Sequence, residues 1–308
     1  MRFLVGYTAT PGGADALALG VRLARAPGAE LDVVLVLNAG DRATLTPTDP
    51  GYDRLLLETA EGWLAEALTL VPAGISVRTH LEHADSFTQG LLAAAARLQA
   101  NLIVVGAATH GLLGRFAIGS VAGGLLHSSH VPVALAPEGT RVMGTDEPIR
   151  RVTCAVGTKA GADGLLTAGI LLARTVDAPL RLVSLVAIDR PGADEQTIVL
   201  AADHAQAVLD YATDHLMDGL EVTASVASGS SIEHAVRGLP WEPTEVCLVG
   251  SSRLAQPHRL FLGSIAAKML RELPVPLIVV PRDFTVLPDA TVLPDATVTP
   301  EFTVTVGK

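Results

Sequence analysis

The sequence predicts an α/β protein built from two doubly wound domains, each with a parallel sheet packed between helices. Short apolar segments alternate along the chain with longer segments whose apolar residues recur at helical spacing. Continuous apolar strands are typical of parallel sheets buried on both faces, and right-handed crossovers between them give the doubly wound arrangement. The segment around Gly106 also recurs 144 residues later around Gly250, which indicates a duplicated domain. With 308 residues, each half is long enough to bury its own core.

In the first half, each predicted strand is a short apolar run and each predicted helix is amphipathic. Pro27-Gly28 ends the first helix, and Asp85 is expected to be the N-cap of the third. The third strand alternates apolar and polar residues, as a strand nearer the sheet edge does, and the polar segment 38–51 predicts a loop. The predicted elements are, in order, strand Arg2–Tyr7, helix Ala14–Arg25, strand Leu31–Leu37, helix Tyr52–Leu70, strand Ile75–Glu82, helix Ser86–Gln99, strand Leu102–Val105, helix Ser120–His127 and strand Val131–Ala136.

The second half repeats this order for the same reasons. Its predicted elements are strand Arg151–Val156, helix Gly164–Thr175, strand Leu180–Val186, helix Asp194–Leu216, strand Glu221–Ala227, helix Ser231–Arg237, strand Val246–Val249, helix Ser264–Leu273 and strand Val275–Val280. We therefore expect one domain over residues 1–138, a linker over 139–149 that is rich in glycine and charge, and a second domain over 150–282.

Residues 283–308 fit neither half and form a low-complexity tail. The hexapeptide Thr285–Ala290 is repeated directly as Thr291–Ala296, and its prolines exclude a helix. A mobile tail is favoured, and the alternative is that its Thr-Val segments add to a sheet edge.

Composition excludes several classes of function. The net charge of −10 argues against nucleic acid as the main partner, because phosphate backbones need a basic surface. No apolar run approaches the roughly 18 residues of a membrane span. The chain begins with a strand pattern and not with a signal peptide, so a cytoplasmic protein is expected. Cys154 and Cys247 lie in apolar strand segments, which favours buried, reduced thiols.

The repeated segment has the layout of a phosphate site. In both halves a strand ends in glycine and a later Gly-Ser pair opens a helix: Gly106 precedes Gly119-Ser120, and Gly250 precedes Gly263-Ser264. A helix start offers free backbone N–H groups and a positive dipole end, and Gly119 has no side chain to keep a phosphate away. Ligands of open α/β sheets bind at the carboxyl ends of the strands, which here include Thr8–Thr10.

These residues resemble the universal stress protein family. The string Gly106-x2-Thr109-x9-Gly119-Ser120 is similar to that family's signature, Gly-x2-Gly-x9-Gly-Ser/Thr, and the resemblance covers both halves, over about residues 1–282. It implies a five-stranded parallel sheet in the order 3-2-1-4-5 in each half. It also implies that the halves pack through their last strands as a pseudo-dimer, with a homodimer as a further assembly.

The function that the resemblance implies is a non-catalytic regulator of the stress response that binds ATP or AMP. The stress signal and the protein partner are not given by it. Adenine would lie over Val36, with Thr8–Thr10 near the ribose and Gly119-Ser120 at the phosphates. The first half is favoured as the site. The predicted nucleotide-binding residues are Thr8, Ala9, Thr10, Val36, Gly106, Thr109, His110, Gly111, Arg115, Gly119, Ser120 and Val121, with Gly250, Arg253, Gly263 and Ser264 in the second half.

The chain departs from the family pattern at the positions that matter most for binding. Thr109 and Arg253 stand where the middle glycine of the signature is expected, and Thr8 and Val156 stand where ATP-binding members carry an acidic residue. Each change would weaken binding by about 1–3 kcal/mol. Arg253 either donates to a phosphate or fills the pocket and pairs with a carboxylate, and both readings stay open. For Arg115, a solvated loop arginine is favoured over a phosphate contact.

Two other classes of function remain as alternatives. The first is an interaction module without nucleotide, in which the altered motifs mark lost binding. The second is an ATP-hydrolysing or adenylating enzyme, since Thr10–Asp15 faintly resembles the loop of ATP pyrophosphatases. That loop's serines are missing, and the start of a helix with a first-turn Asp explains the segment without chemistry. His110, His127 and His130 lack a nearby carboxylate or cysteine at ligand spacing, so no metal site is expected. The sequence shows no nucleophile–base arrangement, so an enzyme is not expected.

Overall fold

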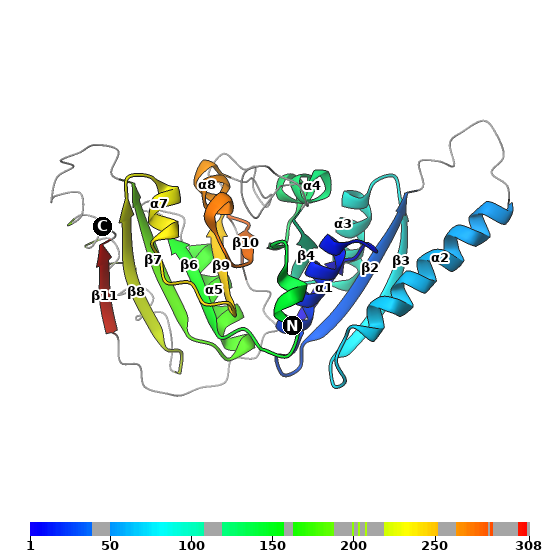
Figure 1. Cartoon of the computed structure of the whole chain (residues 1–308), viewed down its shortest axis with the longest axis horizontal. Coiled ribbons are helices and arrows are strands. Elements are labelled where there is room, and N and C mark those ends of the chain that lie inside the picture. The colour runs from blue at the N-terminus through cyan, green and yellow to red at the C-terminus, as the bar shows by residue number, and fades with distance from the viewer. Residues whose placement is uncertain are drawn as a thin grey trace. The chain divides into compact units, whose positions relative to one another are not determined.

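The computed structural model describes residues 1–38, 50–107, 119–156, 163–187, 199, 203, 207, 219–251, 263–282, 284–285 and 301–306. The chain divides into two compact units, with the described residues up to Pro148 in the first and those from Ile149 onward in the second. Figure 1 shows that each unit consists of neighbouring strands with helices packed beside them. No helix among the described residues is both long and apolar enough to cross a membrane.

The first unit is a parallel sheet in the order β3-β2-β1-β4-β5. The α/β fold with parallel strands, predicted from the apolar runs, is therefore confirmed in this unit. Its elements are β1 (Arg2–Gly6), α1 (Pro11–Ala24), β2 (Glu30–Asn38), α2 (Pro50–Thr69), β3 (Ser76–Ala84), α3 (Phe87–Leu98), β4 (Leu102–Gly106), α4 (Ser120–Ser128), β5 (Val133–Ala136) and the 3₁₀ helix η2 (Thr140–Met143).

The second unit repeats the arrangement as β8-β7-β6-β9-β10, again parallel. Most of the helix expected over 194–216 lies outside the described residues. The described elements are β6 (Arg151–Val156), α5 (Asp163–Val176), β7 (Leu180–Ala187), β8 (Val222–Gly229), α7 (Ile232–Arg237), β9 (Glu245–Gly250), α8 (Ser264–Glu272), β10 (Leu277–Val280) and β11 (Glu301–Val306).

Local chemistry explains where the helices begin. Thr10 caps α1 by accepting a hydrogen bond from the Gly13 N–H at 3.3 Å, and Pro11 occupies the first helical position, where no N–H is needed. The helix thus starts before Ala14, the predicted first residue. The expectation that Asp85 caps α3 is wrong: the cap is Ser86, whose hydroxyl accepts from the Gln89 N–H at 3.2 Å.

The strands also follow their chemistry. β3 is an edge strand of the first sheet, the place that its alternating sequence predicted, and none of its residues is fully buried. β5 and β10 begin two residues later than predicted, just after Pro132 and Pro276. Both prolines lack an N–H for the ladder, but their carbonyl oxygens still accept bonds, from Ile103 N and Cys247 N.

The tail contributes a strand, and this corrects the preference for a mobile tail. Residues 301–306 form β11, which pairs in parallel with β8, the alternative that the sequence left open. The spacing of the prolines explains the position: Pro288, Pro294 and Pro300 recur every six residues, and the next position in this spacing is Val306. Because proline removes a ladder donor, only the segment after Pro300 has an uninterrupted run of N–H groups.

In each unit, the segment that follows the last strand packs against the first helix. The position on the helix is equivalent in the two units, but the residue and its contacts differ. Asp15 is buried on α1 and accepts hydrogen bonds from the N–H groups of Gly139 and Arg141, at 3.2 and 2.8 Å. Arg141 also forms an ion pair with Asp15 at 2.7 Å. Gly164 is the equivalent residue of the second unit, since it lies as far beyond the start of β6 as Asp15 lies beyond the start of β1. It packs closely against the backbone, because a Cβ there would come within 2.7 Å of the Arg282 carbonyl oxygen.

Asp15 is therefore not a first-turn helix residue as expected, but the anchor of the predicted linker. Replacing Asp15 with alanine should lower the free energy of unfolding by about 1–3 kcal/mol, because the partly buried N–H groups of Gly139 and Arg141 lose a buried charged acceptor. Asp146→Ala is the matched control, since Asp146 pairs with Arg25 but is 94% exposed, and it should change stability by less than about 0.5 kcal/mol. Urea unfolding of both variants checks this, and equal losses would contradict it.

A buried charged network lies at the amino-terminal ends of the strands in the second unit. Glu245 is fully buried, and one of its oxygens forms an ion pair with Arg181 at 2.7 Å. The other lies 2.6 Å from Arg151. Burial lowers the pKa of the Arg181 guanidinium, and the Glu245 carboxylate opposes this shift. Arg181 also lies 5.0 Å from the ring centre of Trp241, a cation–π contact.

Candidate functional site

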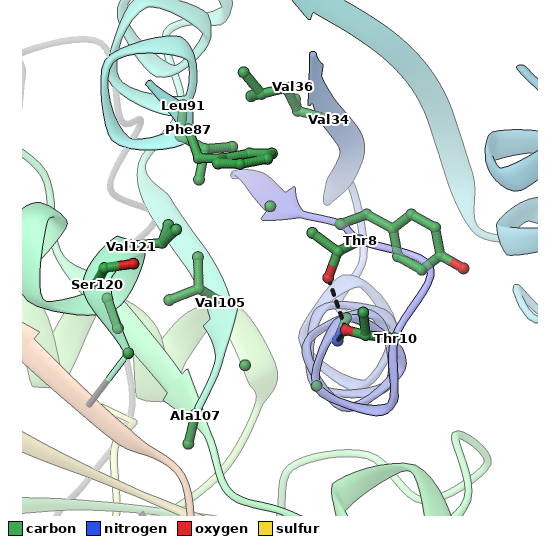
Figure 2. Close-up of a pocket in the computed structure, with 17 residues that line it drawn as sticks. Thr8, Thr10, Val34, Val36, Phe87, Leu91, Val105, Ala107, Ser120 and Val121 are labelled. Atoms are coloured by element: carbon green, nitrogen blue, oxygen red, sulfur yellow. Dashed lines mark hydrogen bonds between the residues drawn. The ribbon is translucent and has the colours of Figure 1, made fainter. Parts of the chain in front are cut away.

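A cavity of about 300 Å³ opens at the carboxyl ends of β1, β2 and β4 in the first unit. This is the place where ligands of open α/β sheets bind, and the volume is at the lower end of small-molecule sites. The loop between β1 and α1 and the first turns of α3 and α4 complete its walls. Figure 2 shows Thr8 and Thr10 on one side of the cavity and Ser120 and Val121 on the other.

Seven of the twelve residues predicted in the first half line this cavity: Thr8, Thr10, Val36, Gly106, Gly119, Ser120 and Val121. Ala9 is not one of the lining residues. Thr109, His110, Gly111 and Arg115 lie outside the described residues. The strand ends and the Gly-Ser helix start, which are far apart in the sequence, are thus brought together around one cavity.

One wall of the cavity is apolar. Val34 and Val36 come from β2, and Phe87 and Leu91 come from α3, one helical turn apart (Figure 2). The sequence interpretation found only Val36 of these four. The signal that could have revealed the others is the spacing of Phe87 and Leu91, which puts two apolar side chains on one face at the start of a helix that follows a strand end.

The opposite part of the cavity is polar but uncharged in the described residues. The hydroxyl groups of Thr8 and Thr10 lie 2.9 Å apart and are hydrogen-bonded, as Figure 2 shows. Thr10 is also the N-cap of α1, so its position is fixed by the helix. Thr8 stands where a family carboxylate was expected, and it offers a ligand a neutral hydroxyl group in its place.

The start of α4 gives one corner of the cavity a positive potential. Gly119 is the N-cap, with φ −70° and ψ 169°, and makes no side-chain cap hydrogen bond. Because glycine has no side chain to accept from them, the first-turn N–H groups at this positive end of the helix dipole can serve a ligand. Gly119, Ser120, Val121 and Ala122 all line the cavity. A phosphate or carboxylate fits this corner.

Two glycines at the base of the cavity serve close packing. A Cβ on Gly106 would lie 2.1 Å from the Gly12 carbonyl oxygen, and one on Gly13 would lie 1.9 Å from the Thr8 carbonyl oxygen. A side chain at either position would displace backbone at the start of α1 or in the loop before it. The first glycine of the motif, Gly106, thus shapes the cavity by letting β4 approach the first turn of α1.

The second unit keeps the same helix start. Gly263 caps α8 with φ −70° and ψ 164°, nearly the backbone conformation of Gly119, and likewise makes no side-chain cap hydrogen bond. Gly250 ends β9 and Ser264 begins α8, as the repeat predicts. Arg253 lies outside the described residues, so both readings of its role stay predictions.

The cysteines belong to the core of the second unit and not to a site. Cys154 on β6 and Cys247 on β9 are free and fully buried on neighbouring strands. Burial raises the pKa of the Cys154 thiol to about 12 and also raises the pKa of Cys247. Both groups therefore stay protonated at neutral pH, which removes the nucleophilic thiolate form.

Comparison with known proteins identifies the family. The sequence profile described as the Universal stress protein family matches residues 1–137 and again residues 148–281. The chain belongs to the universal stress protein family. The two matches show that it is a tandem member, as the internal repeat predicted.

Curated relatives agree with this assignment. The universal stress protein Rv2319c of Mycobacterium tuberculosis strain H37Rv is 30% identical over 293 residues, which cover 91% of this chain and 100% of that protein. The universal stress protein Mb2346c of Mycobacterium bovis matches with the same identity and coverage.

Solved structures support the fold. A universal stress protein from Archaeoglobus fulgidus superposes with a TM-score of 0.62 at 20% identity, covering 91% of this chain and 96% of the other. A universal stress protein from Pseudomonas aeruginosa, titled putative, gives a TM-score of 0.55 at 17% identity and covers 91% and 92%. At these identities the likeness concerns the universal stress protein fold alone.

Proposed function

We propose that this tandem universal stress protein binds an adenine nucleotide in its first unit and acts as a non-catalytic regulator in the stress response. The observation that carries the proposal is the cavity at the carboxyl ends of β1, β2 and β4, which joins an apolar wall to the start of α4 at Gly119. A nucleotide has the complementary pair of features, an apolar base and an anionic phosphate group. Membership of the family supports the stress-response role.

The arrangement supports one orientation of the nucleotide. The base lies against Val36, the ribose hydroxyl groups face Thr8 and Thr10, and the phosphates lie at Gly119 and Ser120. The threonine hydroxyls both donate and accept, so they suit ribose hydroxyls. Without the carboxylate that the family pattern has at position 8, the affinity is expected to be modest, in the micromolar to millimolar range.

The chemistry of the described lining supports a binding role over catalysis. Its one ionisable side chain is Tyr7, whose pKa is raised by burial and, to a lesser extent, by the Glu66 carboxylate. Tyr7 is therefore protonated at neutral pH and is no general base. Hydrolysis of ATP needs a group that orients or deprotonates water, and the described lining does not supply one.

The second candidate is an interaction module without nucleotide, which the neutral Thr8 in place of a carboxylate favours. The experiment that separates the two is mass spectrometry of the small molecules released by denaturing the purified protein. Our proposal predicts that wild-type protein equilibrated with ATP releases bound adenine nucleotide, and that a Gly119→Asp variant treated in the same way releases less. Protein that carries no nucleotide and takes up none from added ATP would instead favour the interaction module.

A further inference from the structure

Phe87 holds an unusual place among the apolar residues of the first unit. It is the first residue of α3, it lines the cavity, and it is nevertheless 39% exposed. Leu91, one turn further along the same helix face, also lines the cavity but is only 3% exposed. The apolar wall therefore ends in the Phe87 ring, which remains partly exposed to solvent.

The backbone around Phe87 fixes the ring at the mouth of the cavity. Ser86 caps α3, which sets the first turn of the helix. Gly90 lies so close to β2 that a Cβ would come within 2.6 Å of Val36 Cγ1, and a Cβ on Gly6 would come within 2.8 Å of Leu91 Cδ1. These two close contacts fix α3 against the sheet. Phe87 therefore lies beside Val36, but Val36 does not cover its ring.

The cavity distinguishes Phe87 from the other exposed apolar residues. Leu55 on α2 is 61% exposed but does not line the cavity. In Figure 2 the Phe87 ring lies on the same side as Val34 and Val36 and across the cavity from Thr10. A planar ring placed in this space would cover Phe87 and contact the valine side chains, while its polar substituents reach toward the threonines and α4.

We propose that Phe87 is the stacking surface for the aromatic ring of the ligand and that it makes this site select ring-bearing phosphates over phosphates without a ring. The inference rests on the proposed nucleotide function and deepens it. Stacking of a base on an aromatic side chain contributes about 1–3 kcal/mol and tolerates different bases. The site therefore prefers a class, phosphates of planar heteroaromatic rings, through a side chain that carries no charge.

The test compares ATP with inorganic tripolyphosphate, which has the phosphates without the ring. Equilibrium binding of both is measured with wild-type protein and with Phe87→Ala, Phe87→Trp and Leu55→Ala, the last being the matched control. We expect Phe87→Ala to weaken ATP about tenfold or more and to leave tripolyphosphate unchanged. Phe87→Trp should retain ATP binding, and its fluorescence should be quenched by ATP but not by tripolyphosphate. Leu55→Ala should behave as wild type.

The outcomes separate the two proposals. If wild-type protein binds ATP and Phe87→Ala binds it equally well, the stacking role is overturned and the nucleotide function stands. Equal losses for ATP and tripolyphosphate in a Phe87→Ala protein of unchanged melting temperature would also overturn it, because they indicate a general change in the cavity. If wild-type protein does not bind ATP, the nucleotide function itself fails, and the inference with it.

Discussion

Replacing Glu245 with alanine is expected to lower the free energy of unfolding of the second unit by about 3–5 kcal/mol. Glu245 is fully buried and neutralises Arg181, whose side chain is only 8% exposed. Its removal leaves that guanidinium buried without a counter-charge and takes away the acceptor of the Thr153 O–H, whose oxygen still accepts from Arg181 Nε. The measurement is urea unfolding followed by circular dichroism.

The matched control is Glu242→Ala. Glu242 is the other acidic partner of Arg151, at 2.7 Å, but its side chain is 49% exposed. Solvent screens such a pair, so its loss should cost less than about 1 kcal/mol. The backbone N–H of Glu242, which donates to Glu245 at 3.1 Å, is kept in the variant. If Glu245→Ala were no less stable than Glu242→Ala, the buried Arg181 guanidinium would not depend on Glu245 for its neutralisation.

The equivalent place in the first unit carries the opposite charge. Asp32 is aligned with Leu4 on β1, and Arg181 is aligned with Thr153 on β6, in each case the third residue of the central strand. The charged partners differ in sign as well. In the first unit, Arg78 and His80 contact the Asp32 carboxylate, whereas in the second unit the Glu245 carboxylate contacts Arg181. Each unit thus compensates its own buried charge, and exchanging one partner alone is expected to be destabilising.

Replacing Gly119 with aspartate is expected to weaken nucleotide binding at least about a hundredfold while leaving the fold intact. Aspartate is a favourable N-cap, and its carboxylate accepts from the first-turn N–H groups of the helix. Those N–H groups are the ones that the proposed function assigns to the phosphates. The carboxylate also places a negative charge where the phosphate charge would lie, and such like-charge contacts cost several kcal/mol.

Gly263→Asp makes the same change in the second unit, at a helix start with nearly identical backbone angles. It should leave nucleotide affinity within about twofold of wild type if the first unit holds the site. Equilibrium dialysis with labelled ATP and a thermal melt of each variant give the comparison. Loss of binding in Gly263→Asp but not in Gly119→Asp would move the site to the second unit.

The repeated frame of the fold is predictable from sequence because the signal is local and occurs twice. Apolar runs such as 102–105 mark strands that are buried on both faces, and the structure places β4 between β1 and β5. The meeting of Thr8, Val36 and Gly119 at one cavity follows from a general rule, since the carboxyl ends of parallel strands share one edge of the sheet.

The parts that sequence did not predict depend on side chains that meet across long separations. The local sequence pattern does not predict the ion pair between Asp15 and Arg141, or the buried ion pair between Arg181 and Glu245. The sequence did not reveal Phe87 as a site residue, because an apolar residue at the start of a helix is usually interpreted as part of the core. Only the structure shows that Phe87 lines the cavity and stays partly exposed. At the start of α3 both Asp85 and Ser86 are good caps, and the backbone path decides for Ser86.

Isothermal titration calorimetry of the wild-type protein with ATP and with AMP measures whether the cavity of the first unit binds an adenine nucleotide. We expect saturable heat with a dissociation constant below about 1 mM and one nucleotide bound per chain, and we expect Gly119→Asp to lose it. No heat from either nucleotide at millimolar concentration, with folded protein, would contradict this expectation.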